Sequence, residues 1–188
     1  MTAPDVFRHV VHALDAAGIP YMLTGSFASA YHAVPRATQD IDLVIAPDRD
    51  QLGELARTFS APSYYCDAGA ALEALEKESL FNVIDLATGW KIDFIIRKSR
   101  EYSLTEFARR QPIVFEGLDL YIATAEDVLL SKLEWAKLGQ SGRQLEDAAW
   151  LLRRRSDDLD LAYVERWVEP LQVAEQWEAV RGLAERLG

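Results

Sequence analysis

Asp40, Asp42 and Asp93 are the residues whose spacing most clearly predicts chemistry. Residues two apart on a strand point to the same face, so Asp40 and Asp42 project together while Ile41 and Leu43 face the other way. Two neighbouring carboxylates repel each other, and a hard divalent cation such as Mg²⁺ removes that cost. Two surface aspartates at a solvated strand end give the same pattern, so the pair alone leaves both interpretations open.

Asp93 strengthens the case for a metal site because apolar residues surround it in the segment Lys91-Ile-Asp-Phe-Ile-Ile96. Acidic side chains are seldom buried unless they are paired or bind a metal. If this segment pairs with the strand expected at 41–45, Asp93 becomes a third ligand. Three carboxylates on adjacent strands suit a two-metal phosphoryl-transfer site. The alternative is an ion pair of Asp93 with Lys91 or Arg97.

Gly25 and Ser26 stand where a short strand is expected to turn into a helix. Glycine lets the backbone approach a ligand closely, and the free amides and dipole of a helix N-terminus favour phosphate. A Gly-Ser pair is also an ordinary helix cap. Its position upstream of the two aspartates is what indicates a phosphate-binding role.

The elements that must position these residues follow from hydrophobic periodicity and turn signals. Strands are expected at 21–24, 41–45, 81–86, 91–96, 113–115 and 118–122. Helices are expected at 5–17, 27–32, from 47 onward, and at 125–138, 143–154, 161–167 and 173–187, with a short strand and a helix within 64–77. We therefore expect an α/β (α+β) core over residues 1–122 and a C-terminal helical extension, residues 123–188, packed on that core.

Composition narrows the classes of function. The chain has 188 residues and a net charge of −10, so it cannot bind nucleic acid by bulk charge alone and needs a local basic patch or a bound cation to do so. Its single cysteine, Cys66, excludes an internal disulfide and a cysteine-rich zinc site. Neither a secretory signal nor an apolar run of roughly 20 residues is found. We expect a soluble, cytoplasmic protein with no membrane partner.

The order of these motifs resembles the nucleotidyltransferase superfamily that includes DNA polymerase β: Gly25-Ser26, then Asp40-x-Asp42, then Asp93 on a later strand. The segment Arg36-x-Thr-x-Asp-Ile-Asp-Leu is similar to the branch that contains the AbiEii and MenT toxins and the antibiotic nucleotidyltransferases. The later segments around Lys132 and Arg143-x-x-x-Asp147 look like the lysine and aspartate motifs of that branch.

The resemblance implies a mixed β-sheet core and a role for each matching residue. It implies that Asp40, Asp42 and Asp93 are catalytic and hold Mg²⁺, in a two-ion site, and that Gly25, Ser26, Arg36, Lys132 and Asp147 bind the nucleotide. From the residues alone, Lys132 either extends to solvent or reaches an anion, and Asp147 can pair with Arg143 one helical turn away.

The function expected from this resemblance is Mg²⁺-dependent transfer of a nucleoside monophosphate from an NTP to a hydroxyl acceptor. The expected acceptor is a tRNA 3′ end or a small molecule. The resemblance also implies that the chain could be the toxin of a toxin–antitoxin system, with an antitoxin protein as its partner. Two alternatives stay open. One is a catalytically silent module that binds a nucleotide or a partner, and the other is a metal-dependent phosphohydrolase.

Overall fold

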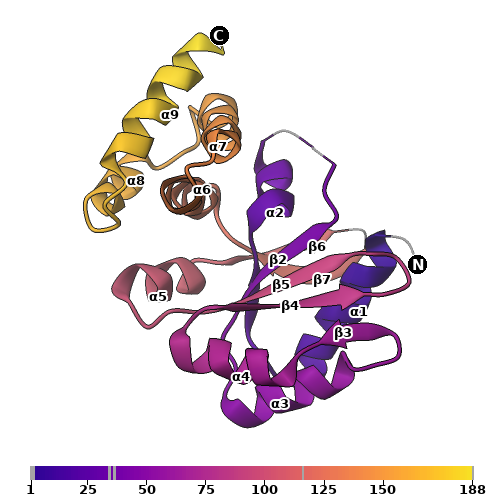
Figure 1. Cartoon of the computed structure of the whole chain (residues 1–188). Helices are drawn as coiled ribbons and strands as arrows, with labels where there is room; N and C mark the ends of the chain where they lie inside the picture. The colour runs from indigo at the N-terminus through magenta and orange to yellow at the C-terminus, as the bar shows by residue number, and fades with distance from the viewer. Residues whose placement is uncertain (1–2, 34, 36, 116, 188) are drawn as a thin grey trace. The chain divides into compact units, whose positions relative to one another are not determined.

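The computed structural model describes residues 3–33, 35, 37–115 and 117–187, which form two compact units (Figure 1). The first, here called the sheet unit, comprises Met1–Thr24 and Ala37–Ile122. The second, the helical unit, comprises Gly25–Arg36 and Ala123–Gly188. The chain thus leaves the sheet unit after Thr24, and returns to it at Ala37.

A seven-stranded mixed sheet forms the centre of the sheet unit, counted over the described residues. The strands are β1 (Tyr21–Leu23), β2 (Asp40–Ile45), β3 (Tyr64–Cys66), β4 (Leu80–Asp85), β5 (Lys91–Ile96), β6 (Gln111–Phe115) and β7 (Leu118–Ile122). Their order is β3-β4-β5-β2-β1-β7-β6. The β2–β5 and β1–β7 pairs are parallel and the others antiparallel, so the expected mixed α/β fold is confirmed.

The described residues of the same unit form four helices: α1 (Ala3–Ala16), α3 (Arg49–Thr58), α4 (Ala68–Lys77) and α5 (Glu101–Ala108). α3 and α4 pack against each other, and α4 also packs against β4 (Figure 1). Phe94 of β5 is fully buried and lies 5.9 Å, between ring centroids, from Phe59 at the end of α3. The alternating apolar residues of β2 and β5 therefore form one side of this core, while the intervening polar residues occupy the opposite sheet face.

The β4–β5 hairpin has its turn between the segments 81–86 and 91–96, which the sequence predicts as strands. The carboxylate of Asp85 is almost fully buried and accepts hydrogen bonds from Ala87 N at 2.9 Å and Thr88 Oγ1 at 2.8 Å. Gly89 has a φ of +74°, a conformation that favours glycine. This turn fixes the pairing of β4 with β5, and so the position of Asp93 in the sheet.

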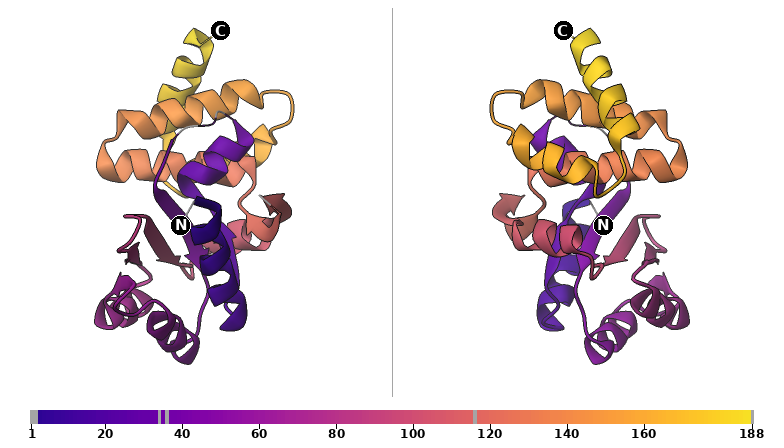
Figure 2. Two further views of the ribbon diagram at one scale, coloured as in Figure 1. Left: turned by 90° about the vertical axis from the view of Figure 1, so that its right-hand side faces the viewer. Right: turned by 90° about the vertical axis from the view of Figure 1, so that its left-hand side faces the viewer.

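The helical unit contains α2 (Gly25–His32), α6 (Ala125–Gly139), α7 (Gly142–Arg154), α8 (Leu161–Val168) and α9 (Ala174–Arg186). Within it α2 packs against α6 and α7, and α7 also packs against α9 (Figure 2). The sequence boundary at residue 122 assigned α2 to the core, whereas its packing partners here are the C-terminal helices. No described helix is both long enough and apolar enough to span a lipid bilayer.

Hydrogen bonds at the start of α6 anchor the interior of the helical unit. Thr124 caps α6, and its hydroxyl donates to Asp127 Oδ2 at 2.8 Å. Asp127 is fully buried and its Oδ1 accepts a hydrogen bond of 2.7 Å from the hydroxyl of Tyr163 on α8. Nε2 of His32, in α2, donates to Ala123 O at 2.8 Å. These bonds tie α2 and α8 to the beginning of α6.

Candidate active site

The register of β2 and β5 places two of the three predicted carboxylates side by side. Asp42 pairs with Asp93, and Asp40 pairs with Lys91. Neighbouring strands lie roughly 4.8 Å apart, and residues in register project from the same face. The side chains of Asp40, Asp42 and Asp93 therefore share one face of the sheet. We call these three residues the carboxylate cluster.

Asn82 extends the row of Asp42 and Asp93 onto the next strand, because β4 pairs Asn82 with Asp93. Its amide is exposed and can donate or accept a hydrogen bond. Sequence reasoning did not assign Asn82 to the site. The signal was its polar side chain between the buried Phe81 and Val83, which places it on the face opposite the core.

Lys91 brings a positive charge to Asp40 and Asp93 of the carboxylate cluster. Its Nζ lies 2.7 Å from Asp93 Oδ2 and 3.8 Å from Asp40 Oδ1. Partial burial acts to lower the pKa of Lys91, but the hydrogen bond to Asp93 and the charges of Asp93, Asp40 and Asp42 outweigh it, so the pKa is raised. The ion pair that the sequence left open as an alternative for Asp93 is thus present. Asp93 nevertheless lies on the same face of the sheet as Asp40 and Asp42.

Asp93 Oδ1 is buried and has no hydrogen-bond partner among the described residues. A buried carboxylate oxygen left without a donor or a cation is costly. Carboxylate oxygens are the ligands that Mg²⁺ prefers, and Asp42 lies in the adjacent register position. The chemistry of these donors therefore fits a divalent cation. Within the described residues, however, no three His, Cys, Asp or Glu side chains converge as a metal-binding group.

Gly25 and Ser26 open α2, at the turn that follows β1. Gly25 has a φ of +64°, which favours glycine over residues that carry a Cβ atom. Ser26 is half-buried in the first turn of the helix. The local conformation predicted from the Gly-Ser pair is therefore present, while its phosphate-binding role stays a prediction.

Lys132 and Asp147 form a buried ion pair between α6 and α7. Lys132 Nζ lies 2.9 Å from Asp147 Oδ2, and the side chains are only 4% and 16% exposed. The partner of Asp147 is thus on a neighbouring helix, whereas the sequence alternative paired it with Arg143 one turn away. The two nucleotide-binding residues predicted from this region therefore contact each other.

The remaining predicted residue, Arg36, lies outside the described residues. The carboxylate cluster belongs to the sheet unit, and Gly25, Ser26, Lys132 and Asp147 belong to the helical unit. That all of these residues serve one nucleotide stays a prediction.

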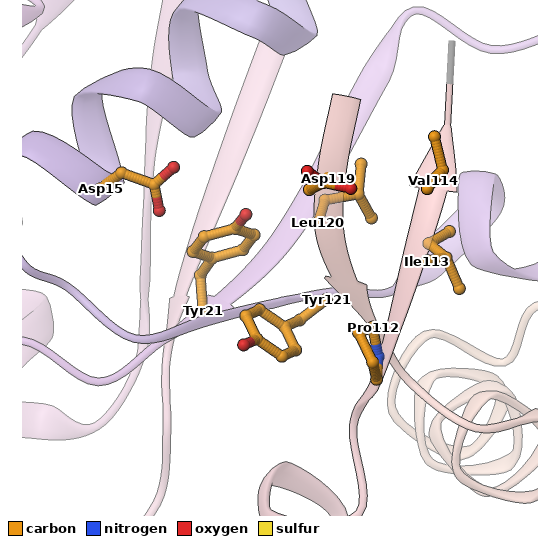
Figure 3. A pocket seen from close by; sticks show the side chains of 8 residues that line it. All are labelled: Asp15, Tyr21, Pro112, Ile113, Val114, Asp119, Leu120 and Tyr121. Atoms are coloured by element: carbon orange, nitrogen blue, oxygen red, sulfur yellow. The ribbon is translucent and has the colours of Figure 1, made fainter. Parts of the chain in front are cut away.

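A separate pocket of about 400 Å³ lies beside β6 and β7 in the sheet unit (Figure 3). The hydroxyl of Tyr21 points into it between Asp15 and Asp119. Burial raises the pKa of Tyr21, and the charge of Asp15 raises it further. Tyr21 pairs with Ile45, whereas Thr24 N donates to Asp42 O, so the pocket lies at the opposite end of β1 from Asp42. It contains none of the predicted site residues.

Comparison with known proteins gives a likeness in structure only. No protein-family model matches the chain, and no curated protein matches it by sequence. The solution structure of the antibiotic-resistance factor ANT(2″)-Ia is similar, with a TM-score of 0.51, 16% identity, and coverage of 97% of this chain and 96% of that one. The crystal structure of ANT(2″)-Ia in complex with adenylyl-2″-tobramycin gives a TM-score of 0.50 and 14% identity, and covers 98% of both chains.

At these identities the likeness shows the fold alone. The chain has a nucleotidyltransferase-like fold, in which a seven-stranded mixed sheet is combined with helices before, between and after the strands. The expected fold class is therefore confirmed. The narrower resemblance to the AbiEii and MenT branch stays a prediction.

Proposed function

We propose that this chain is a Mg²⁺-dependent nucleotidyltransferase, which moves a nucleoside monophosphate from an NTP to a hydroxyl group of an acceptor. The observation that carries the proposal is the pairing of Asp42 with Asp93 on neighbouring strands, where Asp93 keeps one buried oxygen without a partner. The nucleotidyltransferase-like fold supports the same activity.

In the proposed reaction the acceptor oxygen attacks the α-phosphorus and forms the new P–O bond. The bond from that phosphorus to the bridging oxygen breaks, and pyrophosphate leaves. The proton of the acceptor hydroxyl passes to Asp93 or to whichever carboxylate of the cluster lies nearest, which acts as a general base. Asp40, Asp42 and Asp93 would hold Mg²⁺, as one or two ions, and bound Mg²⁺ supplies neutralisation of the triphosphate charge.

The nucleotide-binding roles in the proposal fall to residues of the helical unit. Gly25 and Ser26 offer backbone amides at the start of α2, where the helix dipole favours phosphate. Lys132 contacts the triphosphate and Asp147 orients Lys132, a division of roles that their ion pair of 2.9 Å supports. Arg36 adds a second positive charge toward the phosphates.

A small molecule is the acceptor that the charge of the chain favours. At a net charge of −10 the protein repels polyanions and attracts cationic molecules, and it leaves the approach of neutral ones unaffected. The structurally similar ANT(2″)-Ia was solved with an adenylylated small molecule, adenylyl-2″-tobramycin, which supports the same class of acceptor. A tRNA acceptor, with an antitoxin as partner, is the competing outcome of the test below.

Calorimetric titration of each NTP into the purified chain, with Mg²⁺ and again with EDTA, tests the proposal. We expect binding that requires Mg²⁺ and is lost in Asp42→Ala, while the exposed Asp50→Ala on α3 serves as the matched control. Transfer from α-³²P-labelled NTP to aminoglycosides, small alcohols and tRNA then identifies the acceptor. Absence of NTP binding would favour a silent or partner-binding module, and release of free nucleotide without transfer would favour a phosphohydrolase.

A further inference from the structure

Tyr21 places a polar group of a buried side chain at the wall of the pocket beside β6 and β7. The residue is only 4% exposed, and none of the described residues forms a hydrogen bond with its hydroxyl. Figure 3 shows the hydroxyl pointing into the pocket of about 400 Å³ instead. Because a buried polar group without a partner is costly, a molecule in the pocket must satisfy this hydroxyl.

Two carboxylates flank the hydroxyl, Asp15 of α1 and Asp119 of β7 (Figure 3). Neither carboxylate forms an ion pair with a described residue. Both charges raise the pKa of the tyrosine between them, so the electrostatic potential at its hydroxyl is negative. The guanidinium of Arg110 lies 5.1 Å from the ring centre of Tyr121 and donates to Phe107 O at 2.6 Å. The pocket therefore favours a cation beside the two carboxylates.

The rest of the lining is largely apolar and comes from β6 and β7. Among the described residues, β1 and β7 pair at one position, Leu23 with Ile122. Two residues earlier on each strand, Tyr21 and Leu120 line the pocket. The side chains that complete the wall are those of Pro112, Ile113, Val114 and Tyr121. A pocket of this volume, with apolar walls and a few polar groups, is typical of sites for small organic molecules.

The pocket is separate from the carboxylate cluster. Tyr21 pairs with Ile45 of β2, and residues in register project from the same face of a sheet. Ile45 is three residues from Asp42, so the two side chains project from opposite faces. Tyr21 thus lies on the face opposite the cluster as well as at the other end of β1. A ligand in this pocket is distinct from the nucleotide and its metal.

We propose that this pocket binds an organic cation, a protonated amine that carries an apolar group. The ammonium lies between Asp15 and Asp119 and donates a third hydrogen bond to the hydroxyl oxygen of Tyr21, since an ammonium has three N–H donors. The apolar group contacts the wall that β6 provides. A bare metal ion fits less well, because it requires more oxygen ligands and leaves the apolar wall unused. This inference does not depend on the proposed function.

Titration of the full chain with phenethylammonium, followed by two-dimensional NMR of the backbone amides, tests the inference. Phenethyl alcohol has the same skeleton without the charge, and phenylacetate carries a negative charge. We expect phenethylammonium to shift the resonances of residues 113, 114 and 119–121, with a dissociation constant in the millimolar range that suits so small a ligand. Phenethyl alcohol should bind about tenfold more weakly because it makes no charge-assisted hydrogen bond, and phenylacetate should not bind.

Single substitutions identify the groups that hold the ammonium. Asp15 and Asp119 are exposed, so asparagine at either position removes a charge and retains the shape of the side chain. We expect Asp15→Asn and Asp119→Asn each to weaken the binding of phenethylammonium by about fivefold, and to leave that of phenethyl alcohol unchanged. Tyr21→Phe should weaken the binding of phenethylammonium by about threefold. The matched control is Asp50→Asn, which removes an exposed charge on α3 away from the pocket and should have less than a roughly twofold effect.

Four results would overturn the inference. Equal affinities for phenethylammonium and phenethyl alcohol would reduce the pocket to an apolar cavity. Equal weakening in Asp119→Asn and Asp50→Asn would assign the effect to net charge. Shifts centred on residues 40–42 and 91–93 would place the amine at the carboxylate cluster, and absence of shifts at tens of millimolar would leave the pocket without this ligand. None of these results bears on the binding of Mg²⁺ or NTP, so the proposed function is tested separately.

Discussion

Asp42 and Asp93 are direct neighbours in the register of the parallel strands β2 and β5, although they are far apart in the sequence. Both strands are internal to the sheet, with β1 beside β2 and β4 beside β5. Hydrogen bonds on both sides therefore fix the backbone at each aspartate. A site that is built on such elements is positioned more precisely than one on loops, which suits carboxylates that must share a cation.

Replacement of Asp93 by asparagine tests the importance of this pairing. We expect Asp93→Asn to weaken Mn²⁺ binding by roughly tenfold or more, because a neutral amide replaces one of the neighbouring carboxylates. Free Mn²⁺ measured by electron paramagnetic resonance checks the affinity, and circular dichroism checks the fold. Asn82→Ala changes the other neighbour of Asp93 in the same row and should have a smaller effect. An unchanged affinity for Mn²⁺ in Asp93→Asn would show that Asp93 does not bind the cation and serves only in its ion pair with Lys91.

The shared face of Asp40 and Asp42 could be predicted from the sequence, because Ile41, Leu43 and Ile45 alternate with them and strands have a period of two. Which strand lies beside them could not be read from periodicity, since pairing depends on the whole topology of the sheet. The position of Asp93 next to Asp42 was therefore a conditional expectation, which the β2–β5 register fulfils.

The helical regions show where local patterns stop being informative. The sequence did not predict α5, which has eight residues and whose N-cap residue, Arg100, makes no side-chain capping hydrogen bond. Lys132 and Asp147 each lie beside the apolar stripe of their own helix, but periodicity within one helix says nothing about a partner on another. Their ion pair, like the burial of Asp127, depends on how the helices pack.

Removal of one partner from the ion pair of Lys132 and Asp147 should be costly because both groups are buried. We expect Asp147→Leu to lower the free energy of unfolding by about 3 kcal/mol, since it leaves the buried ammonium without this carboxylate. Lys132→Met combined with Asp147→Leu should recover much of that loss, because the buried ammonium is then removed together with its carboxylate. Urea unfolding of the single and double variants measures the coupling.

The exposed ion pair of Arg49 with Glu76 offers the control for that cycle, because its side chains are 63% and 67% exposed. Its double variant, Arg49→Met with Glu76→Leu, should show a far smaller coupling. Equal coupling in the two pairs would mean that burial adds nothing to the interaction of Lys132 with Asp147.

His32 should make the stability of the chain depend on pH. Burial lowers its pKa below 6.5, and the guanidinium of Arg155, 3.5 Å from Nδ1, acts in the same direction. The unfolded chain therefore binds a proton near pH 6.5 while the folded chain does not. The contribution of neutral His32 to the free energy of unfolding is therefore fully present above that pH. It is lost as the pH falls, by up to about 1.4 kcal/mol per pH unit.

The variant His32→Gln removes this titration and retains a donor for Ala123 O. Urea unfolding at pH 7.5 and 5.5 should show a smaller loss of stability in His32→Gln than in the unaltered chain. The exposed His12, on α1, provides the control as His12→Gln. The same pH dependence in His32→Gln and the unaltered chain would contradict the assignment.

Tyr21 should oppose folding at high pH. Its side chain is 4% exposed, and burial, with the charges of Asp15 and Asp119, raises its pKa well above the usual 10.0. Between pH 10 and the folded pKa the unfolded chain loses this proton while the folded chain keeps it, so stability falls as the pH rises. Tyr21→Phe removes that loss, and its unfolding free energy should therefore vary less between pH 9.5 and 11.

A spectrophotometric titration at 295 nm provides the direct measurement, since tyrosinate absorbs there. The difference between the unaltered chain and Tyr21→Phe should show one tyrosine that ionises only at a pH well above 10 or when the chain unfolds. Asp119→Asn removes one of the two negative charges beside the Tyr21 hydroxyl, so the same tyrosine should ionise at a lower pH than in the unaltered chain. A difference curve centred at pH 10 in the folded chain would show that the Tyr21 hydroxyl is solvated, and that the pocket of Figure 3 imposes no cost on its ionised form.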